Sequence, residues 1–302
     1  MTDLGPDRQD QIAFMRLGHQ CPFAGWFREQ ARGLATGLKL PFADIDLTGR
    51  PDIAAELGAY CPMQVAAPGG VLLAAPRPTE VLRQNLSGVG MAEGELSPQP
   101  RPPGGMALDV NAYRPGDSAW PAAVAATGRV CLGESTAAAR GAEALADKRR
   151  WLEDLKRPEG PDPVIFLAGT PEEATAFCEF IPVWAAHVPL PAATPNELFL
   201  TCLHAGTNPG PAGDVRASLL EQALKGLEAA SPPLQGAGGC WAVVGRRGPY
   251  PNGPLDMFLD AGFSKSADLG QIVLPGRGRD ELILVHWRPA SPQRSASHSA
   301  PC

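Results

Sequence analysis

A cysteine followed by proline is the first feature of the sequence whose chemistry is readily named. Residues 18–23 read GHQCPF, so Cys21 directly precedes Pro22 after an apolar run. Thiol redox sites often begin in this way, with a second cysteine two residues after the proline. Ala24 occupies that position here. Cys21 is therefore either a working thiol without its usual partner or a small apolar residue packed in a core.

Two further side chains are candidates for acid–base work. Glu179 stands in the apolar run CEFIPV, where burial would raise its pKa toward the range of a general base. The alternative is a glutamate on the solvent face of an alternating strand. His204 lies in another apolar run. It is either a base or a core or cleft residue whose hydrogen bonds are satisfied. Its neighbour Cys202 would point to the opposite face of a strand, which argues against a Cys–His pair.

Composition limits the class of protein. The chain has 302 residues, which suits two domains, and a net charge of −6, which argues against nucleic-acid binding. No apolar stretch reaches the length of a membrane span, and the polar start is unlike a signal peptide. The 7 cysteines are odd in number and lack disulfide-framework spacing, which predicts a reducing cytoplasm. Cysteine and histidine spacing also predicts no metal site.

Residues 87–105, rich in glycine and proline, are predicted to link two domains because they carry almost no large apolar side chains. Residues 289–302 are predicted to be a disordered tail for the same reason. The folded parts are then residues 10–86 and residues 106–288.

The first part has a legible order of elements. Strands are predicted at IAFMRL, PFADIDL, MQVAA and VLLAA, and helices at AGWFREQARGLATGL, RPDIAAELGAY and PTEVLRQNL. The order is βαβαββα. With Cys-Pro before the first helix and CPM before the third strand, residues 10–86 resemble the thioredoxin and glutaredoxin fold. The resemblance implies that Pro62 follows a cis peptide bond and that Cys61 lies across from Cys21, so that these two cysteines form a candidate thiol pair.

The second part alternates strands and helices in a longer series. Strands are predicted at MALDVNAY, PVIFLAG, ATAFCEFIPV, ELFLTCLHAG, CWAVVG and ELILVHWR, with the second and third forming a hairpin. Helices are predicted at PGDSAWPAAVAA, ESTAAARGAEALADKRRWLEDL, DVRASLLEQALKGLEAA and PLDMFLDAGF. The fold class predicted for the whole chain is α/β with two domains, the second built on a mixed sheet.

Three stretches of this second part resemble the GNAT superfamily of acyl-CoA-dependent N-acyltransferases: FCEFIPVWAA, LTCLHAG…GDVRASLLEQAL and PNGPLDMFLDAGF. The whole chain is also similar to GNAT proteins of the YoaP type, which carry a thioredoxin-like domain, although there it follows the acyltransferase part. The resemblance implies acetyl-CoA as co-substrate. It places the pantetheine along the fourth strand, near Leu203 and His204, and the diphosphate at the start of the next helix.

The diphosphate loop departs from the family pattern. The resemblance assigns it to Gly213, Asp214, Val215, Arg216 and Ala217. Side chains at positions 214 and 216 obstruct close approach of the backbone, and the Asp214 carboxylate would cap the helix where a phosphate should bind. Pairing of Arg216 with phosphate would offset this repulsion. We therefore expect weakened or rebuilt CoA binding.

The general acid also departs from the family pattern. Where many family members have a tyrosine four residues before the glycine of Gly-Phe, this chain has Phe258, which cannot donate a proton. Tyr250, a few residues upstream, is the candidate substitute.

These features support three hypotheses. The first is an acetyl-CoA-dependent N-acyltransferase acting on an amine of a small molecule or peptide, with Glu179 or water as base. The second is a GNAT-fold protein without CoA-dependent catalysis, used for interaction or sensing. The third is a thiol redox protein that uses Cys21 and Cys61. The acceptor amine cannot be identified from the residues.

Overall fold

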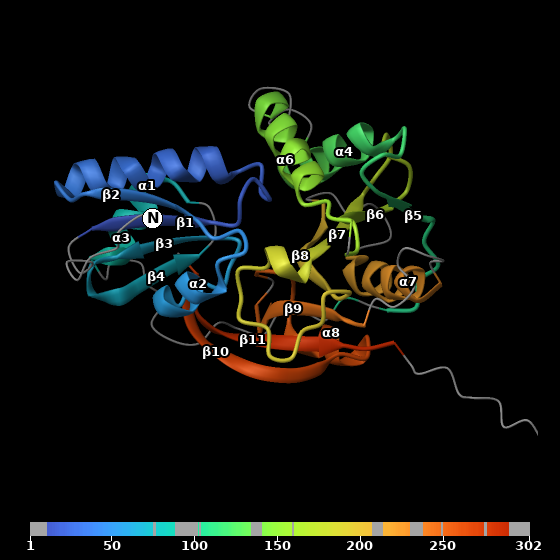
Figure 1. Cartoon of the computed structure of the whole chain (residues 1–302). Coiled ribbons are helices and arrows are strands. Elements are labelled where there is room, and N and C mark those ends of the chain that lie inside the picture. The colour runs from blue at the N-terminus through green and yellow to red at the C-terminus, as the bar shows by residue number, and fades with distance from the viewer. Residues whose placement is uncertain are drawn as a thin grey trace, which may run out of the picture.

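The computed structural model of the chain describes residues 11–74, 77–87, 102, 104–133, 141–158, 160–206, 214–229, 238–248, 250–274 and 277–289. They form an N-terminal half and a C-terminal half that lie side by side (Figure 1). Most of the predicted linker at 87–105 and of the predicted tail at 289–302 falls outside the described residues, as does Gly213. The two-domain division stays a prediction.

The N-terminal half has the element order that the sequence predicts. In chain order its elements are β1 (Ile12–Arg16), α1 (Ala24–Leu38), β2 (Phe42–Asp46), α2 (Pro51–Leu57), β3 (Met63–Ala67), the 3-10 turn η2 (Pro68–Gly70), β4 (Val71–Ala74) and α3 (Thr79–Leu86). The strands lie in the order β2-β1-β3-β4, and only β1 and β2 run parallel. Helix α1 forms because Phe27, Ala31 and Leu34 recur at helical spacing and are fully buried.

The C-terminal half follows with a longer series of elements. They are β5 (Val110–Tyr113), α4 (Trp120–Leu132), α6 (Ala142–Asp154), β6 (Val164–Ala168), β7 (Ala176–Pro182), the 3-10 turn η3 (Val183–Ala185), β8 (Leu198–Ala205), α7 (Arg216–Ala229), β9 (Cys240–Gly245), α8 (Leu255–Asp260), β10 (Ser264–Leu274) and β11 (Gly278–Trp287). The predicted hairpin is confirmed, because β6 and β7 pair antiparallel.

The C-terminal sheet is covered by helices on both faces. Its strands lie in the order β5-β6-β7-β8-β9-β11-β10. Side chains alternate along β6: Val164 and Phe166 pack with α7, whereas Ile165 and Leu167 pack with α4 and α6 on the other face. A strand buried on both faces is apolar throughout, which explains the continuous run that predicts it.

The pair β8 and β9 is the one parallel pair among the described strands of the C-terminal half, and it is short. Residues 198–200 pair with residues 240–242, and no further pairs follow, so the two strands separate. The side chain of Asn252 spans the gap. Its Oδ1 accepts the N–H of Leu203 at 3.1 Å and its Nδ2 donates to the carbonyl of Val243 at 3.0 Å. The second half of β8 thus lies beside an opening in the sheet.

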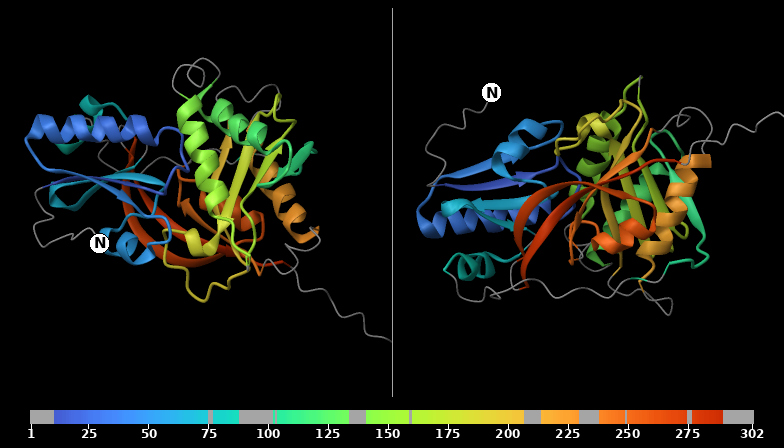
Figure 2. Two further views of the ribbon diagram at one scale, coloured as in Figure 1. Left: turned by 45° about the horizontal axis from the view of Figure 1, so that its top comes forward. Right: turned by 90° about the horizontal axis from the view of Figure 1, so that it is seen from below.

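The two halves share one sheet. Strand β10 pairs in parallel with β4 through Val273 and Leu73, which gives an 11-stranded sheet. Figure 2 shows the red strands β10 and β11 curving from the C-terminal half to meet the N-terminal strands. Close contacts continue along the junction: Gly18, with a φ of +49°, lies so near Trp151 that a Cβ at position 18 would be 2.1 Å from the indole Nε1.

One strand was not predicted, one predicted helix is described only in part, and one expectation from the sequence is wrong. Strand β10 was not predicted, because SKSADLGQIVL mixes charged residues and glycine with an apolar end. Of the helix predicted over residues 134–155, the structure shows α6 from Ala142 to Asp154, and residues 134–140 lie outside the described residues. The peptide bond before Pro62 is trans, since the one cis bond among the described residues is Tyr250–Pro251.

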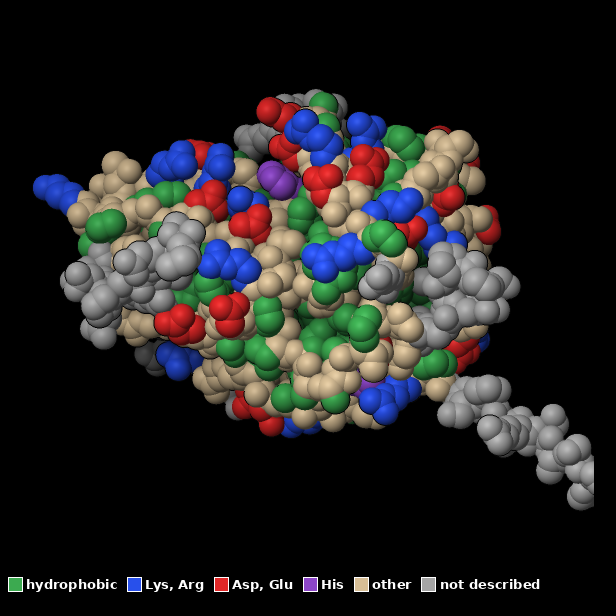
Figure 3. All heavy atoms as spheres, viewed as in Figure 1, with side chains coloured by type: hydrophobic (Ala, Val, Ile, Leu, Met, Phe, Trp, Pro, Cys, Tyr) green, Lys and Arg blue, Asp and Glu red, His purple; other side chains and the backbone are tan. Residues whose placement is uncertain are grey.

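The surface carries no extended patch of one charge on the face shown in Figure 3, where acidic and basic side chains are interspersed. None of the helices in the described part of the chain has the length and apolarity needed to cross a membrane. Within the same residues, no cluster of three or more His, Cys, Asp or Glu side chains is arranged to hold a metal ion.

Candidate active site

A cavity of about 570 Å³ lies between the two halves. The N-terminal half contributes the turn before α1 and the start of β3. The C-terminal half contributes the ends of α4 and β8, the start of α7 and the loop before α8. Small-molecule sites have volumes of about 300–1,000 Å³ and favour such junctions. The cavity runs along the part of β8 that has separated from β9.

Glu179 lies behind the wall of this cavity and is fully buried. Its Oε2 is 2.7 Å from Lys148 Nζ, and its Oε1 accepts hydrogen bonds from Thr201 Oγ1 at 2.7 Å and Gln20 Nε2 at 3.3 Å. Both carboxylate oxygens are therefore engaged. This arrangement makes Glu179 an anchor for Lys148 and Thr201, which do line the cavity, rather than a free base.

Lys148 projects from α6 into the cavity wall and is buried almost completely. Burial lowers the pKa of a lysine, but the ion pair with Glu179 outweighs burial, and the pKa of Lys148 lies above its ordinary value. The ammonium is also 5.5 Å from the centre of the Phe177 ring. Lys148 is a fixed positive charge beside the cavity.

Three thiols line the cavity: those of Cys21, Cys131 and Cys202. Cys21 stands in the turn before α1, Cys131 near the end of α4, and Cys202 in β8. A hydrogen bond from the Cys21 thiol to Cys131, together with burial, raises the pKa of Cys21. The same bond, helped by Lys148 and opposed by burial, lowers the pKa of Cys131. Burial raises the pKa of Cys202.

Cys61 is placed differently from Cys21. It is fully buried in the core of the junction, and burial followed by the charge of Asp280 raises its pKa. Among the described residues, the thiol that contacts Cys21 is that of Cys131. The structure therefore supplies Cys21 with a partner from the C-terminal half, where the family resemblance had pointed to Cys61.

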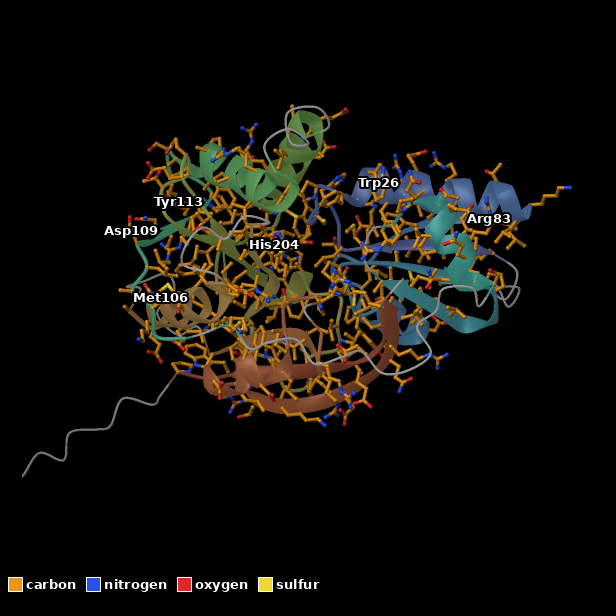
Figure 4. The ribbon with its side chains drawn as sticks, turned by 180° about the vertical axis from the view of Figure 1, so that it is seen from behind. Trp26, Arg83, Met106, Asp109, Tyr113 and His204 are labelled. Atoms are coloured by element: carbon orange, nitrogen blue, oxygen red, sulfur yellow. The ribbon has the colours of Figure 1, made fainter. Side chains whose placement is uncertain are left out.

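His204 lines the cavity from β8 and is mostly buried. Figure 4 shows it near the middle of the molecule, whereas Asp109 and Tyr113 lie at the outer edge of the sheet. Its Nε2 is buried without a hydrogen-bond partner. Burial and then Arg216 lower the pKa of His204, while Asp214 raises it, with a net lowering. A neutral imidazole with a free nitrogen is what a general base at neutral pH requires.

Tyr250 reaches the cavity from the loop before α8, and its hydroxyl donates to the carbonyl of Met63 at 3.2 Å. Burial, followed by the charges of Cys61 and Cys21, raises the pKa of the phenol well above its usual value. The phenol therefore stays protonated. Phe258, which the sequence analysis had set aside as a proton donor, is fully buried in α8.

At the start of α7, the side chains of Asp214 and Arg216 bond to each other. The Oδ1 of Asp214 accepts the N–H of Arg216 at 3.1 Å, and the Arg216 guanidinium pairs with the same carboxylate at 2.6 Å. Burial acts to raise the pKa of Asp214, but these bonds outweigh it and the pKa lies below its ordinary value. Val215 and Ala217 are buried in the core below.

Acetyl-CoA fits this site in part. The cavity follows β8 from Thr201 to Gly206, which suits a pantetheine arm, although Asn252 already takes the Leu203 N–H. The helix terminus to which the sequence resemblance assigned the diphosphate carries Asp214, already bonded to Arg216. Two other cations, Arg77 and Arg277, line the cavity near each other, and the pKa of Arg77 is lowered by burial and then by Arg277.

Sequence reasoning missed several members of the site, among them Lys148 and Cys131. Lys148 was detectable, because it stands three residues after Leu145 and four before Leu152, on the apolar face of a predicted helix. Cys131 gave no such signal. It stands in the last turn of a helix rich in small residues, and its neighbours in the cavity come from distant segments.

No protein-family model matches the sequence, and the search of curated proteins also finds no match. Solved structures of acetyltransferases resemble about three fifths of the chain. The ribosomal-protein-S18-alanine N-acetyltransferase of Escherichia coli is 12% identical, covers 62% of this chain and 97% of its own, and has a TM-score of 0.37.

A ribosomal-protein-alanine N-acetyltransferase of Brucella melitensis is 13% identical over 59% of this chain and 99% of its own, with a TM-score of 0.38. An acetyltransferase of Thermus thermophilus is 21% identical over 59% of this chain and 96% of its own, with a TM-score of 0.33. The three proteins are acetyltransferases, and the sequence identities and TM-scores that relate this chain to them are low.

Proposed function

We propose that this protein transfers an acyl group from a thioester of coenzyme A to an amine, with the reaction in the cavity between its halves. The observation that carries the proposal is the separation of β8 from β9 after residues 200 and 242, with the cavity along the freed part of β8. An extended pantetheine arm can lie along such a strand, as the resemblance to GNAT acyltransferases implies.

His204 is the proposed base. Its neutral, unpartnered Nε2 takes the proton of the attacking amine. Tyr250 is the proposed acid, because its protonated phenol is able to donate to the leaving thiolate. Glu179 positions Lys148 and Thr201 instead of acting as the base. Arg216 exchanges Asp214 for a phosphate group of the co-substrate.

The test combines binding and turnover. Titration calorimetry with acetyl-CoA measures affinity, and transfer of a radiolabelled acetyl group to a panel of polyamines and peptide amines measures activity. We expect His204→Gln to bind acetyl-CoA normally and to lose about a hundredfold or more in turnover, since one acid–base group is removed. Absence of acetyl-CoA binding at millimolar concentration would reject the proposal.

A second candidate is a protein with this fold that does not use CoA. The closed start of α7, where Asp214 and Arg216 satisfy each other, favours it. In that case the cavity binds a smaller ligand, and calorimetry with acetyl-CoA gives no heat while ligand soaks fill the same cavity.

A further inference from the structure

Six cysteines are present among the described residues, and they divide into two groups. Cys61, Cys178 and Cys240 are fully buried and do not line the cavity. Cys21, Cys131 and Cys202 are half-buried and open onto it. Free cysteines usually serve as small apolar residues in a core, and the first group fits that description. The second group converges on one space from three separate segments.

Within this second group, a hydrogen bond joins Cys21 and Cys131. Cys21 stands in the turn that opens α1, where the Phe23 N–H bonds to its sulfur, and its thiol donates to Cys131. Cys131 stands in the last turn of α4, with Lys148 nearby. One thiol therefore comes from each half of the molecule.

We propose that Cys131 and Cys21 form a thiol–disulfide exchange site across the two halves, with small disulfides of low-molecular-weight thiols as substrates. The cavity of about 570 Å³ gives such a disulfide access to both sulfurs. This activity is independent of acyl transfer. It differs from a Cys-x-x-Cys site, because Ala24 leaves the helix with a single thiol and the partner is supplied by α4.

The reaction begins at Cys131. Its thiolate attacks one sulfur of the disulfide RSSR, which forms the mixed disulfide Cys131–S–S–R and releases RS⁻. The released thiolate takes the proton of Cys21 and leaves as RSH. The Cys21 thiolate then attacks the Cys131 sulfur, so that a Cys21–Cys131 disulfide forms and the second RS⁻ departs. Two protein thiols are oxidised and one small disulfide is reduced.

The roles of the two sulfurs follow from their surroundings. Exchange is started by the thiol with more thiolate at neutral pH, and the lowered pKa of Cys131 meets that need. Cys21, whose pKa is raised, keeps its proton until the leaving group takes it. Cys202 shares the cavity but has a raised pKa and receives a hydrogen bond from Gln20, which makes it the matched control.

The experiment uses the full chain with Cys302→Ser, so that the cysteines under test are the six that the structure describes. The reduced protein is treated with bis(2-hydroxyethyl) disulfide, and intact mass is recorded before digestion with trypsin. We expect the mass to fall by two hydrogen atoms and a disulfide to join the tryptic peptides 17–28 and 130–140, each of which contains one cysteine.

Single variants separate the roles. Cys21→Ser should accumulate the mixed disulfide on peptide 130–140, because nothing resolves it. Cys131→Ser should slow consumption of the disulfide by about tenfold or more. Cys202→Ser should behave as the parent. Circular dichroism verifies that each variant is folded, and the Cys21→Ser adduct reports on Cys131 even if Cys131→Ser does not fold.

Three results would overturn the proposal. The first is a disulfide that joins other peptides. The second is a mixed disulfide on another cysteine in Cys21→Ser. The third is an unchanged rate in Cys131→Ser. Because acetyl-CoA takes no part in these measurements, failure of the acyl-transfer proposal leaves them interpretable.

Discussion

The ion pair of Lys148 and Glu179 fixes the Lys148 side chain in the cavity wall, and both side chains have almost no solvent exposure. Removing one partner leaves the other charge buried and unpaired, which costs about 3–5 kcal/mol. We expect Lys148→Met and Glu179→Gln each to lower the free energy of unfolding by an amount of this order, measured by urea denaturation.

The double variant Lys148→Met with Glu179→Gln is the control for this prediction. It removes both charges, so it should be more stable than either single variant. Additive losses in the double variant would show that the two charges do not stabilise each other.

His187 gives the protein a defined sensitivity to acid. It lies fully inside the core of the junction with its ring 5.7 Å from that of Phe199, and burial lowers its pKa from 6.5 to about 4. Between these pH values the unfolded chain binds a proton at this position and the folded protein does not, so the free energy of unfolding falls as the pH is lowered from 6.5 to 4. Below pH 4 both states are protonated.

Replacement of His187 by phenylalanine tests this. The His187→Phe variant keeps an aromatic ring against Phe199 and removes the titrating group, so the free energy of unfolding should depend less on pH across the same window. Thermal or urea unfolding at several pH values measures it. His19→Gln, at an exposed histidine, is the matched control and should keep the full slope.

Part of this residue-level picture was available from the sequence. Apolar flanks identified Glu179 and His204 as unusual, and both are largely withdrawn from solvent. The pairing of Glu179 was not identifiable, because Lys148, although detectable as a lysine on an apolar helix face, and Gln20 reach it from segments far away in the chain. Which thiol meets Cys21 depends in the same way on how the two halves pack.

Among the elements, the start of α7 controls the proposed use of CoA. Asp214 there both caps the helix and holds Arg216. In Asp214→Asn the side-chain oxygen still accepts the Arg216 N–H, but the negative charge is gone. We expect this variant to bind acetyl-CoA more tightly than the parent with little loss of stability, measured by calorimetry and thermal unfolding.

Asp214→Gly is the companion variant. It removes both charge and cap, so it should also bind more tightly but lose about 1 kcal/mol of stability. Weaker binding in both variants would mean that the diphosphate binds elsewhere.

Most elements were predictable because their pattern is local. The alternating and helical periods of β1, α1, β6, β7 and α7 survive in the fold. Strand β10 was not predictable, because its exposed first part is polar and its partners β11 and β4 supply the pairing. Long-range pairing overrides a weak local preference in such a strand.

The whole molecule is held together by more than the chain between its halves. Strand β4 pairs with β10, the Tyr250 hydroxyl bonds to Met63, and the Gly49 N–H bonds to the Ala185 carbonyl at 3.0 Å. We expect limited proteolysis to cut within 87–105 first, and the two fragments to elute together in gel filtration until denaturant is added.

The sequence suggested two domains but not this junction. Composition identifies a linker, whereas nothing in the sequence of β4 indicates that its edge pairs with β10. Fragments that separate after cleavage without denaturant would show that the shared sheet contributes little to their association.

The shared sheet also sets an order of events during protein synthesis. Strand β4 is complete early, yet its neighbour β10 stands much later in the chain and leaves the ribosome long after it. Until then the nascent N-terminal half presents an open strand edge, which is prone to pair with other chains. A truncated message that stops before Ser264 would leave that edge open permanently, and its product would be a client for chaperones rather than a smaller working protein.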